Sequence, residues 1–123
     1  MEGALSGVRV LDLSRVLAGP YASQNLADLG AEVLKIEAPW GDDTRSWGPP
    51  FTKDFEGNDV AAYFLSCNRG KQIIRMNLKE QTKDLQHLIS QADVIVENFR
   101  PGTFDRLAPD LPCLLYTSPS PRD

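Results

Sequence analysis

Hydrophobic residues in the first third of the chain form two short continuous runs, separated by a segment with helical spacing. Residues 8–13 (VRVLDL) and 33–36 (VLKI) are rich in leucine and β-branched residues, which is typical of buried strands. Between them, residues 20–30 predict an amphipathic helix that begins near Pro20 and ends at Gly30. Its expected apolar face consists of Ala22, Leu26 and Leu29. The pattern predicts a strand-helix-strand unit with a right-handed parallel crossover.

The periodic pattern is lost between residues 37 and 60. Glycine and proline punctuate this segment, at Pro39, Gly41, Gly48, Pro49, Pro50 and Gly57. We therefore expect one long loop, and long loops inside compact domains are usually functional or mobile.

A second strand-helix-strand unit follows this segment. We expect a short buried helix at 61–67, strands at 72–76 and 94–96, a helix at 80–91 and the start of another at 103–107. The helix at 80–91 would bury Leu85, Leu88, Ile89 and Ala92 on one face. Two such units with continuously apolar strands predict an α/β fold, a Rossmann-like parallel sheet with helices on both faces.

Composition narrows the class of protein. The 123 residues include 13 basic and 17 acidic side chains, a net charge of −4. No strongly basic face is therefore expected, which argues against nucleic acid and anionic membranes as partners. The sequence has no apolar run long enough to span a membrane and no visible targeting segment. Cys67 and Cys113 form no C-x-x-C pair, so a reducing compartment is expected, either the mitochondrial matrix or the cytoplasm.

Residues 113–123 (CLLYTSPSPRD) stand apart from the rest. They could form a short strand at 114–117 followed by a Pro/Ser-rich end. Their codons can also be written as the adapter of a transposase-based sequencing library, and we prefer this explanation. We therefore exclude 113–123 from the fold and treat 1–112 as the N-terminal part of a larger, truncated domain. Resequencing across the Pro112 codon tests this expectation.

Parallel sheets bind ligands beyond the carboxyl ends of their strands, which here means residues 14–19, 37–45, 77–79 and 97–102. Four basic residues fall in these segments: Arg15, Arg45, Lys79 and Arg100. Arg15 precedes a predicted helix N-terminus, where free N–H groups favour anions. Arg15 taken alone is better explained as an ordinary surface arginine beside a helix start, but the four basic residues together favour a polyanionic ligand.

Several familiar sites are missing from the sequence. No G-x-G-x-x-G follows the first strand, and the sequence has neither a G-x-x-x-x-G-K-[ST] loop nor a G-x-S-x-G elbow. We expect His87 to be exposed, Cys67 to lie in the core, and Asp42 and Asp43 to form a cap or a solvated turn. No metal site and no cofactor are expected.

Four segments resemble class III CoA-transferases, the family of formyl-CoA transferase, carnitine CoA-transferase and related racemases. They are LSGVRVLDLSRVLAGPYASQNLADLGAEVLKIEAP, GDDTRSWGPPF, NRGKQIIRMNLK and ADVIVENFRPGTFDRL. The resemblance covers about residues 4–107, and GDDTRSWGPPF resembles the succinate-dicarboxylate branch. It implies CoA thioesters and carboxylic acids as substrates and an interlocked homodimer as the assembly.

The resemblance also implies which residues bind CoA. Val16 and Ala18 would contact the nucleotide through their backbone, near Arg15. The adenosine would be flanked by Met76, Asn77, Leu78 and Lys79, the groove would be lined by Asn98, Phe99 and Arg100, and Arg106 would reach a phosphate. Leu17 replaces a glutamine of formyl-CoA transferase and Ala38 replaces an arginine, so substrate choice and one phosphate contact would differ.

The implied reaction uses an aspartate nucleophile and an aspartyl-CoA thioester. In the family this aspartate lies downstream of the ENFRPG motif, and no acidic residue here matches it, so residues 1–112 alone should be inactive. A racemase of the same family is an alternative, and it would need a histidine and an aspartate further along. A Rossmann-like oxidoreductase, testable by nicotinamide binding, and a non-catalytic CoA-binding module are two others.

Overall fold

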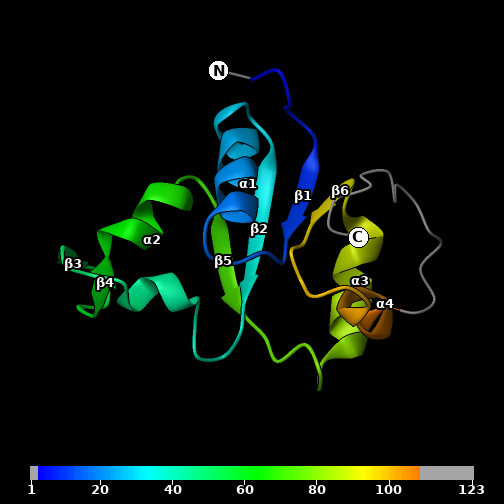
Figure 1. The fold of residues 1–123 in the computed structure, drawn as a ribbon. Coiled ribbons are helices and arrows are strands. Elements are labelled where there is room, and N and C mark those ends of the chain that lie inside the picture. The colour runs from blue at the N-terminus through cyan, green and yellow to red at the C-terminus, as the bar shows by residue number, and fades with distance from the viewer. Residues whose placement is uncertain (1–2, 109–123) are drawn as a thin grey trace.

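A four-stranded parallel sheet lies at the centre of the computed structural model, which describes residues 3–108 (Figure 1). The strands are β1 (Arg9–Asp12), β2 (Glu32–Glu37), β5 (Gln72–Arg75) and β6 (Val94–Val96), in the spatial order β5-β2-β1-β6. Each neighbouring pair is parallel, with Val10 opposite both Val33 and Val94. The predicted fold class and all four predicted strands are confirmed.

Helices cover both faces of this sheet. On one face, Val10 and Val33 pack with residues of α1 (Ala18–Asp28). On the other face, Leu11 packs with Leu85 and Ile89 of α3 (Thr82–Gln91). The alternation of side chains along each strand explains why neighbouring apolar residues serve two separate clusters. The predicted face of the 80–91 helix is confirmed, and α4 (Thr103–Leu107) forms where it was expected.

The predicted apolar face of the first helix is confirmed only at Leu26, which packs against Val10 and Val33. The buried residues of this helix are Pro20, Ser23 and Gln24, whereas Ala22 is exposed and Leu29 is 50% exposed. The buried face is partly polar because Gln24 is hydrogen-bonded to two residues more than 40 positions along the chain. Its side-chain N–H donates to the Ser66 carbonyl at 2.8 Å, and its carbonyl accepts from the Arg69 amide at 2.6 Å.

The segment between β2 and α2 (Ala62–Cys67) is not one unstructured loop. It contains a 3₁₀ turn η1 (Asp43–Ser46) and an antiparallel hairpin of β3 (Phe51–Lys53) and β4 (Asp59–Ala61). The Asp54 carboxylate shapes the hairpin turn by accepting from the amides of Glu56 and Asn58, both at 2.9 Å. Strands of three residues are too short to show a period in the sequence. The short helix α2 confirms the prediction for residues 61–67.

The structure does not describe residues 109–123, so it tests some expectations only in part or not at all. The two explanations of residues 113–123, and the chain's continuation after Pro112, lie outside the described residues. Among residues 3–108, no helix is both long and apolar enough to cross a membrane.

Candidate functional site

The loops that follow β1 and β6 meet at the carboxyl edge of the sheet, the lower edge in Figure 1. The side-chain oxygen of Asn98 accepts from the Arg15 amide at 3.2 Å, and its N–H donates to the Arg15 carbonyl at 2.8 Å. The β1–α1 loop (residues 13–17) is therefore tied to the end of β6. Two residues that the sequence assigned to one site, 83 positions apart, are in direct contact.

The loop after β5 reaches the same edge from the far side of the sheet. Met76 is buried and Leu78 packs against the same apolar cluster. The Asn77 side chain accepts from the Lys79 amide at 3.1 Å, and the Asn77 amide donates to Gln81 at 2.9 Å, so Asn77 fixes a tight turn. Lys79 itself is exposed.

Phe99 lies in the loop after β6 and connects it to the loop after β5. Its ring packs against the cluster that holds Met76 and Leu78. Arg100 is exposed, and its carbonyl accepts from the Thr103 amide at the start of α4. Arg106 is exposed and donates to the Thr103 hydroxyl at 3.3 Å. The loops after β5 and β6 thus share one apolar floor with cations at their surface.

Arg45 does not belong to the set of ligand-facing cations, and that part of the prediction is wrong. Its guanidinium makes two hydrogen bonds to Glu37, at 2.7 and 2.6 Å, and lies 4.0 Å from the centre of the Phe64 ring. The hydrogen bonds that Arg45 donates to Glu37, together with the charge of this carboxylate, raise the pKa of Arg45 above its ordinary value. Within residues 3–108, no carboxylate pairs with the other three cations, Arg15, Lys79 and Arg100.

Beneath this edge lies a buried ionic network that the sequence analysis missed. Its three ion pairs are Asp12–Lys71 at 2.9 Å, Lys35–Asp42 at 3.1 Å and Glu37–Arg45 at 2.6 Å. One signal was present: Lys35 and Glu37 share with Val33 the period-2 positions of an otherwise apolar strand. Charged residues at inward-facing strand positions indicate a buried pair.

Asp42 illustrates what the sequence could and could not show. As expected it caps a turn, because its carboxylate accepts from the Thr44 amide at 3.0 Å. It is not solvated, however, and its other oxygen accepts from Lys35 and from the Val16 amide. Burial alone would raise the pKa of Asp42, but the hydrogen bonds from Thr44 and the charge of Lys35 outweigh it and lower the pKa.

Asp12 has a similar environment at the end of β1. Burial would raise the pKa of this carboxyl, but hydrogen bonds from Ser14 and Ser23 and the ammonium of Lys71 hold the pKa below its ordinary value. The carboxylate is therefore ionised at neutral pH. Because Asp12 and Asp42 are both buried in ion pairs, neither is placed to attack a substrate. Cys67 is buried and His87 is exposed, as expected.

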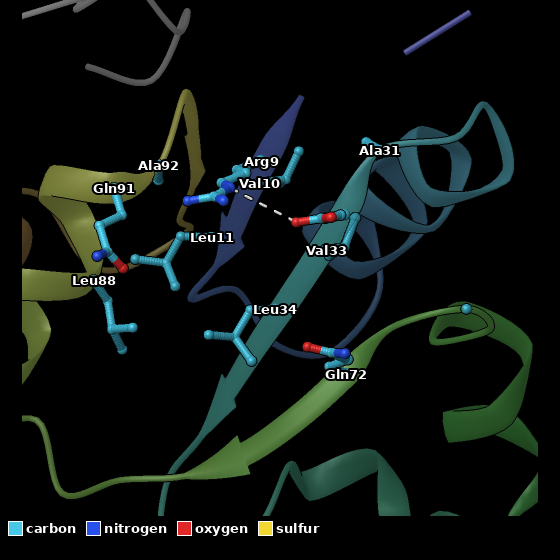
Figure 2. Close-up of a pocket in the computed structure, with 12 residues that line it drawn as sticks. Arg9, Val10, Leu11, Ala31, Val33, Leu34, Gln72, Leu88, Gln91 and Ala92 are labelled. Carbon is cyan, nitrogen blue, oxygen red and sulfur yellow. Dashed lines mark ion pairs between the residues drawn. The ribbon is translucent and has the colours of Figure 1, made fainter. Parts of the chain in front are cut away.

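A cavity of about 460 Å³ lies at the opposite end of the sheet, between α3 and the amino-terminal halves of β1 and β2. Figure 2 shows Leu11, Leu34 and Leu88 pointing into it. The Arg9–Glu32 ion pair, at 3.7 Å, stands at its border with both side chains largely exposed. None of the residues predicted to bind CoA lines this cavity.

Comparison with known proteins identifies the family to which this sequence is related. The sequence model of CoA-transferase family III matches residues 5–119. The chain is 52% identical over 106 residues to a mouse succinyl-CoA:glutarate CoA-transferase, covering 84% of this chain and 23% of that one. It is 52% identical over 100 residues to a succinate–glutarate CoA-transferase of Agrobacterium fabrum, covering 78% and 25%.

A solved structure with a similar fold and sequence supports the same family. A CaiB/BaiF family protein from Brucella suis superposes with a TM-score of 0.82 at 48% identity, covering 87% of this chain and 29% of that chain. The chain spans about a quarter of the length of the curated relatives it matches. Because the family model matches most of the length of this chain, the chain belongs to CoA-transferase family III.

Proposed function

We propose that the protein to which this chain belongs transfers CoA between a CoA thioester and a carboxylic acid. Family membership is the observation that carries the proposal. Residues 3–108 would contribute part of the CoA site, at the carboxyl edge of the sheet. Carboxyl edges are where open α/β sheets bind their ligands.

The chemistry of CoA suits this edge. CoA carries a 3′-phosphate and a pyrophosphate, which are bound by cations and by the amides of a helix N-terminus. The N-terminus of α1 has no side-chain cap, and Arg15, Lys79 and Arg100 are exposed at the edge. The apolar floor under Met76, Leu78 and Phe99 would receive the adenine. We propose the binding residues inferred from the sequence, with Arg45 in a structural role.

The proposed reaction has an aspartate nucleophile outside residues 3–108. Its carboxylate attacks the acyl-CoA thioester, forming a mixed anhydride and releasing CoA thiolate. The thiolate attacks the aspartyl carbonyl of the anhydride, which releases the first acid and leaves an aspartyl-CoA thioester. The acceptor carboxylate attacks this thioester, which releases CoA thiolate and forms a second mixed anhydride. The thiolate then attacks the acceptor's carbonyl in that anhydride, which forms the new acyl-CoA and frees the aspartate. On this proposal the 123-residue chain alone is inactive.

We propose succinyl-CoA as donor and a dicarboxylic acid as acceptor. Two similar proteins are named for succinyl-CoA or succinate with glutarate, and one from Haloarcula marismortui for succinyl-CoA with mesaconate. Leu17 is 48% exposed before α1. Because the resemblance places it where formyl-CoA transferase has a glutamine, we propose that it contributes to the choice of acid. We further propose a homodimer, in the mitochondrial matrix or the cytoplasm.

A chimera tests the proposal. Residues 3–108 would replace the matching segment of the mouse succinyl-CoA:glutarate CoA-transferase, and turnover of succinyl-CoA with glutarate would be measured. We expect activity in the chimera and none in the 123-residue chain alone. A chimera that folds as a dimer but does not turn over would refute the function, whereas turnover by the 123-residue chain would refute the external nucleophile.

Matched arginine variants locate the CoA site in the chimera. Arg100→Gln should raise the KM for succinyl-CoA about tenfold, because one charge-assisted contact to a phosphate is lost. Arg69→Gln removes an arginine that is paired with Asp28 away from this edge, and it should leave KM unchanged. Equal effects of the two substitutions would contradict the proposed site.

A further inference from the structure

The β1–α1 loop is held by side chains at three consecutive residues. The Lys35 ammonium donates to the Ser14 carbonyl at 3.0 Å. Asn98 binds both backbone groups of Arg15, and the Asp42 carboxylate accepts from the Val16 amide at 3.3 Å. The loop is therefore clamped from β2 and its following turn on one side and from the end of β6 on the other.

Val16 has a backbone conformation that needs such support. Its φ is +76°, and it is the one non-glycine residue with positive φ in the described part of the chain. A β-branched side chain rarely adopts this region, because it costs energy that the surroundings must offset. Asp42 supplies the acceptor that fixes the Val16 amide in this conformation.

Lys35 and Asp42 themselves are almost completely buried. Both side chains are 1% exposed, and they lie 3.1 Å apart. A buried ion pair is weak evidence for stability, because a well-packed apolar pair of similar volume is often as stable. Its contacts with the loop backbone give this pair a function that an apolar pair could not perform.

We propose that Lys35 and Asp42 are positioning residues, which hold residues 14–16 of the β1–α1 loop in the conformation that receives the phosphates of CoA. This inference rests on the proposed function. The two side chains do not touch the ligand and act only through the loop backbone. Asn98 completes the clamp from the other side.

The substitution Asp42→Asn separates the two roles of this carboxylate. An asparagine that keeps its oxygen toward Thr44 preserves the turn, but its NH₂ then faces the Val16 amide and the Lys35 ammonium, which are both donors. The double variant Asp42→Asn with Lys35→Met removes the unpaired buried cation without restoring an acceptor for Val16. Asp43→Asn is the matched control, because Asp43 is the exposed neighbour and loses the same charge.

Amide hydrogen exchange in the 123-residue chain tests the clamp without any ligand. We expect Asp42→Asn to accelerate exchange of the Val16 amide about tenfold, as for the loss of one charge-assisted hydrogen bond, and Asp43→Asn to leave it unchanged. The double variant should recover the thermal unfolding midpoint of the unsubstituted chain, but its Val16 amide should still exchange as fast as in Asp42→Asn. Unchanged protection of Val16 in Asp42→Asn would overturn the inference, whatever its activity.

Kinetics of the chimera test the consequence for CoA. Asp42→Asn and the double variant should both raise the KM for succinyl-CoA about tenfold with kcat nearly unchanged, the pattern of lost ground-state binding. Recovery of KM together with stability in the double variant would show a purely structural role and overturn the inference. An inactive unsubstituted chimera would count against the proposed function, and the exchange data would then decide the clamp alone.

Discussion

The ammonium of Lys71 lies 2.9 Å from a carboxylate oxygen of Asp12, and both side chains are completely buried. The same ammonium donates to the Pro20 carbonyl at 2.9 Å and to the Asn68 side chain at 2.8 Å. All three of its N–H donors are therefore used. One side chain ties the end of β1, the first turn of α1 and the loop before β5 into a single unit.

Lys71→Met should lower the free energy of unfolding by about 3 kcal/mol, because it leaves a buried carboxylate without its cation. Lys53→Met is the matched control, since Lys53 pairs with Asp59 at 2.6 Å while both side chains are more than 60% exposed. The control should lose less than about 1 kcal/mol. Urea denaturation of both variants measures the difference, and similar losses would contradict the prediction.

Acid should destabilise the chain through Asp12 and Asp42. The pKa of each is lowered in the folded state, so each carboxylate contributes stability that is present above its unfolded pKa, about 3.9. That stability is lost as the pH falls through the folded pKa. We expect the free energy of unfolding to decline steadily below about pH 5, measured by urea denaturation at a series of pH values.

Removal of one hydroxyl should shift this acid response. Ser23 donates to Asp12, so Ser23→Ala should raise the folded-state pKa of Asp12 toward its unfolded value. The acid-induced loss of stability should then be smaller and end at a higher pH, relative to the variant's own value at pH 7. Ser90→Ala is the control, because the Ser90 hydroxyl is exposed and donates to the His87 carbonyl. Identical pH profiles in the two variants would exclude the role assigned to Ser23.

Arg45→Lys should cost about 1–3 kcal/mol, because lysine cannot reproduce the two-pronged contact with the buried Glu37 carboxylate. Arg69 provides the same substitution at an exposed site, where it makes two hydrogen bonds to Asp28. Arg69→Lys should cost under about 0.5 kcal/mol. Thermal unfolding compares the two, and an equal change in midpoint would show that burial of Glu37 is unimportant.

Gly19→Ala should destabilise the chain by about 1–3 kcal/mol. A Cβ at Gly19 would overlap the Cβ and Oγ atoms of Ser14, which is itself bonded to Asp12. Ser14→Gly removes both of these atoms. The double variant should therefore be more stable than the sum of the two single losses predicts, by about 1 kcal/mol or more. Strict additivity in chemical denaturation would rule out the overlap as the cause.

The apolar runs were enough to predict the sheet, because a parallel strand with helices on both sides must be hydrophobic on both faces. Positions such as Val10 and Leu11 carry that signal without reference to any other part of the chain. Most of the face of α1 was mispredicted because Ser23 is buried against Asp12 of β1 and Gln24 against Ser66, 42 positions along the chain. A helical period in hydrophobicity cannot reveal a polar face that is satisfied by distant groups.

The candidate site could likewise be predicted only in part from the sequence. The meeting of Arg15 and Asn98 follows from parallel topology, which brings the carboxyl ends of neighbouring strands together. Arg45 is not a free cation because the Glu37 side chain points toward it. No local pattern in the sequence predicts that direction. The roles that the family resemblance assigns to Met76, Asn77 and Lys79 remain predictions.

The pairing of β6 with β1 also sets the order in which the clamp can be assembled during synthesis. The β1–α1 loop is followed at once by α1 and β2, so Lys35 and Asp42 leave the ribosome soon after Val16. Asn98 emerges 83 residues after Arg15, and β6 must add to β1 across that separation, a slow non-local step in folding. The nascent chain therefore holds one side of the loop early and the other side only near the end of this segment.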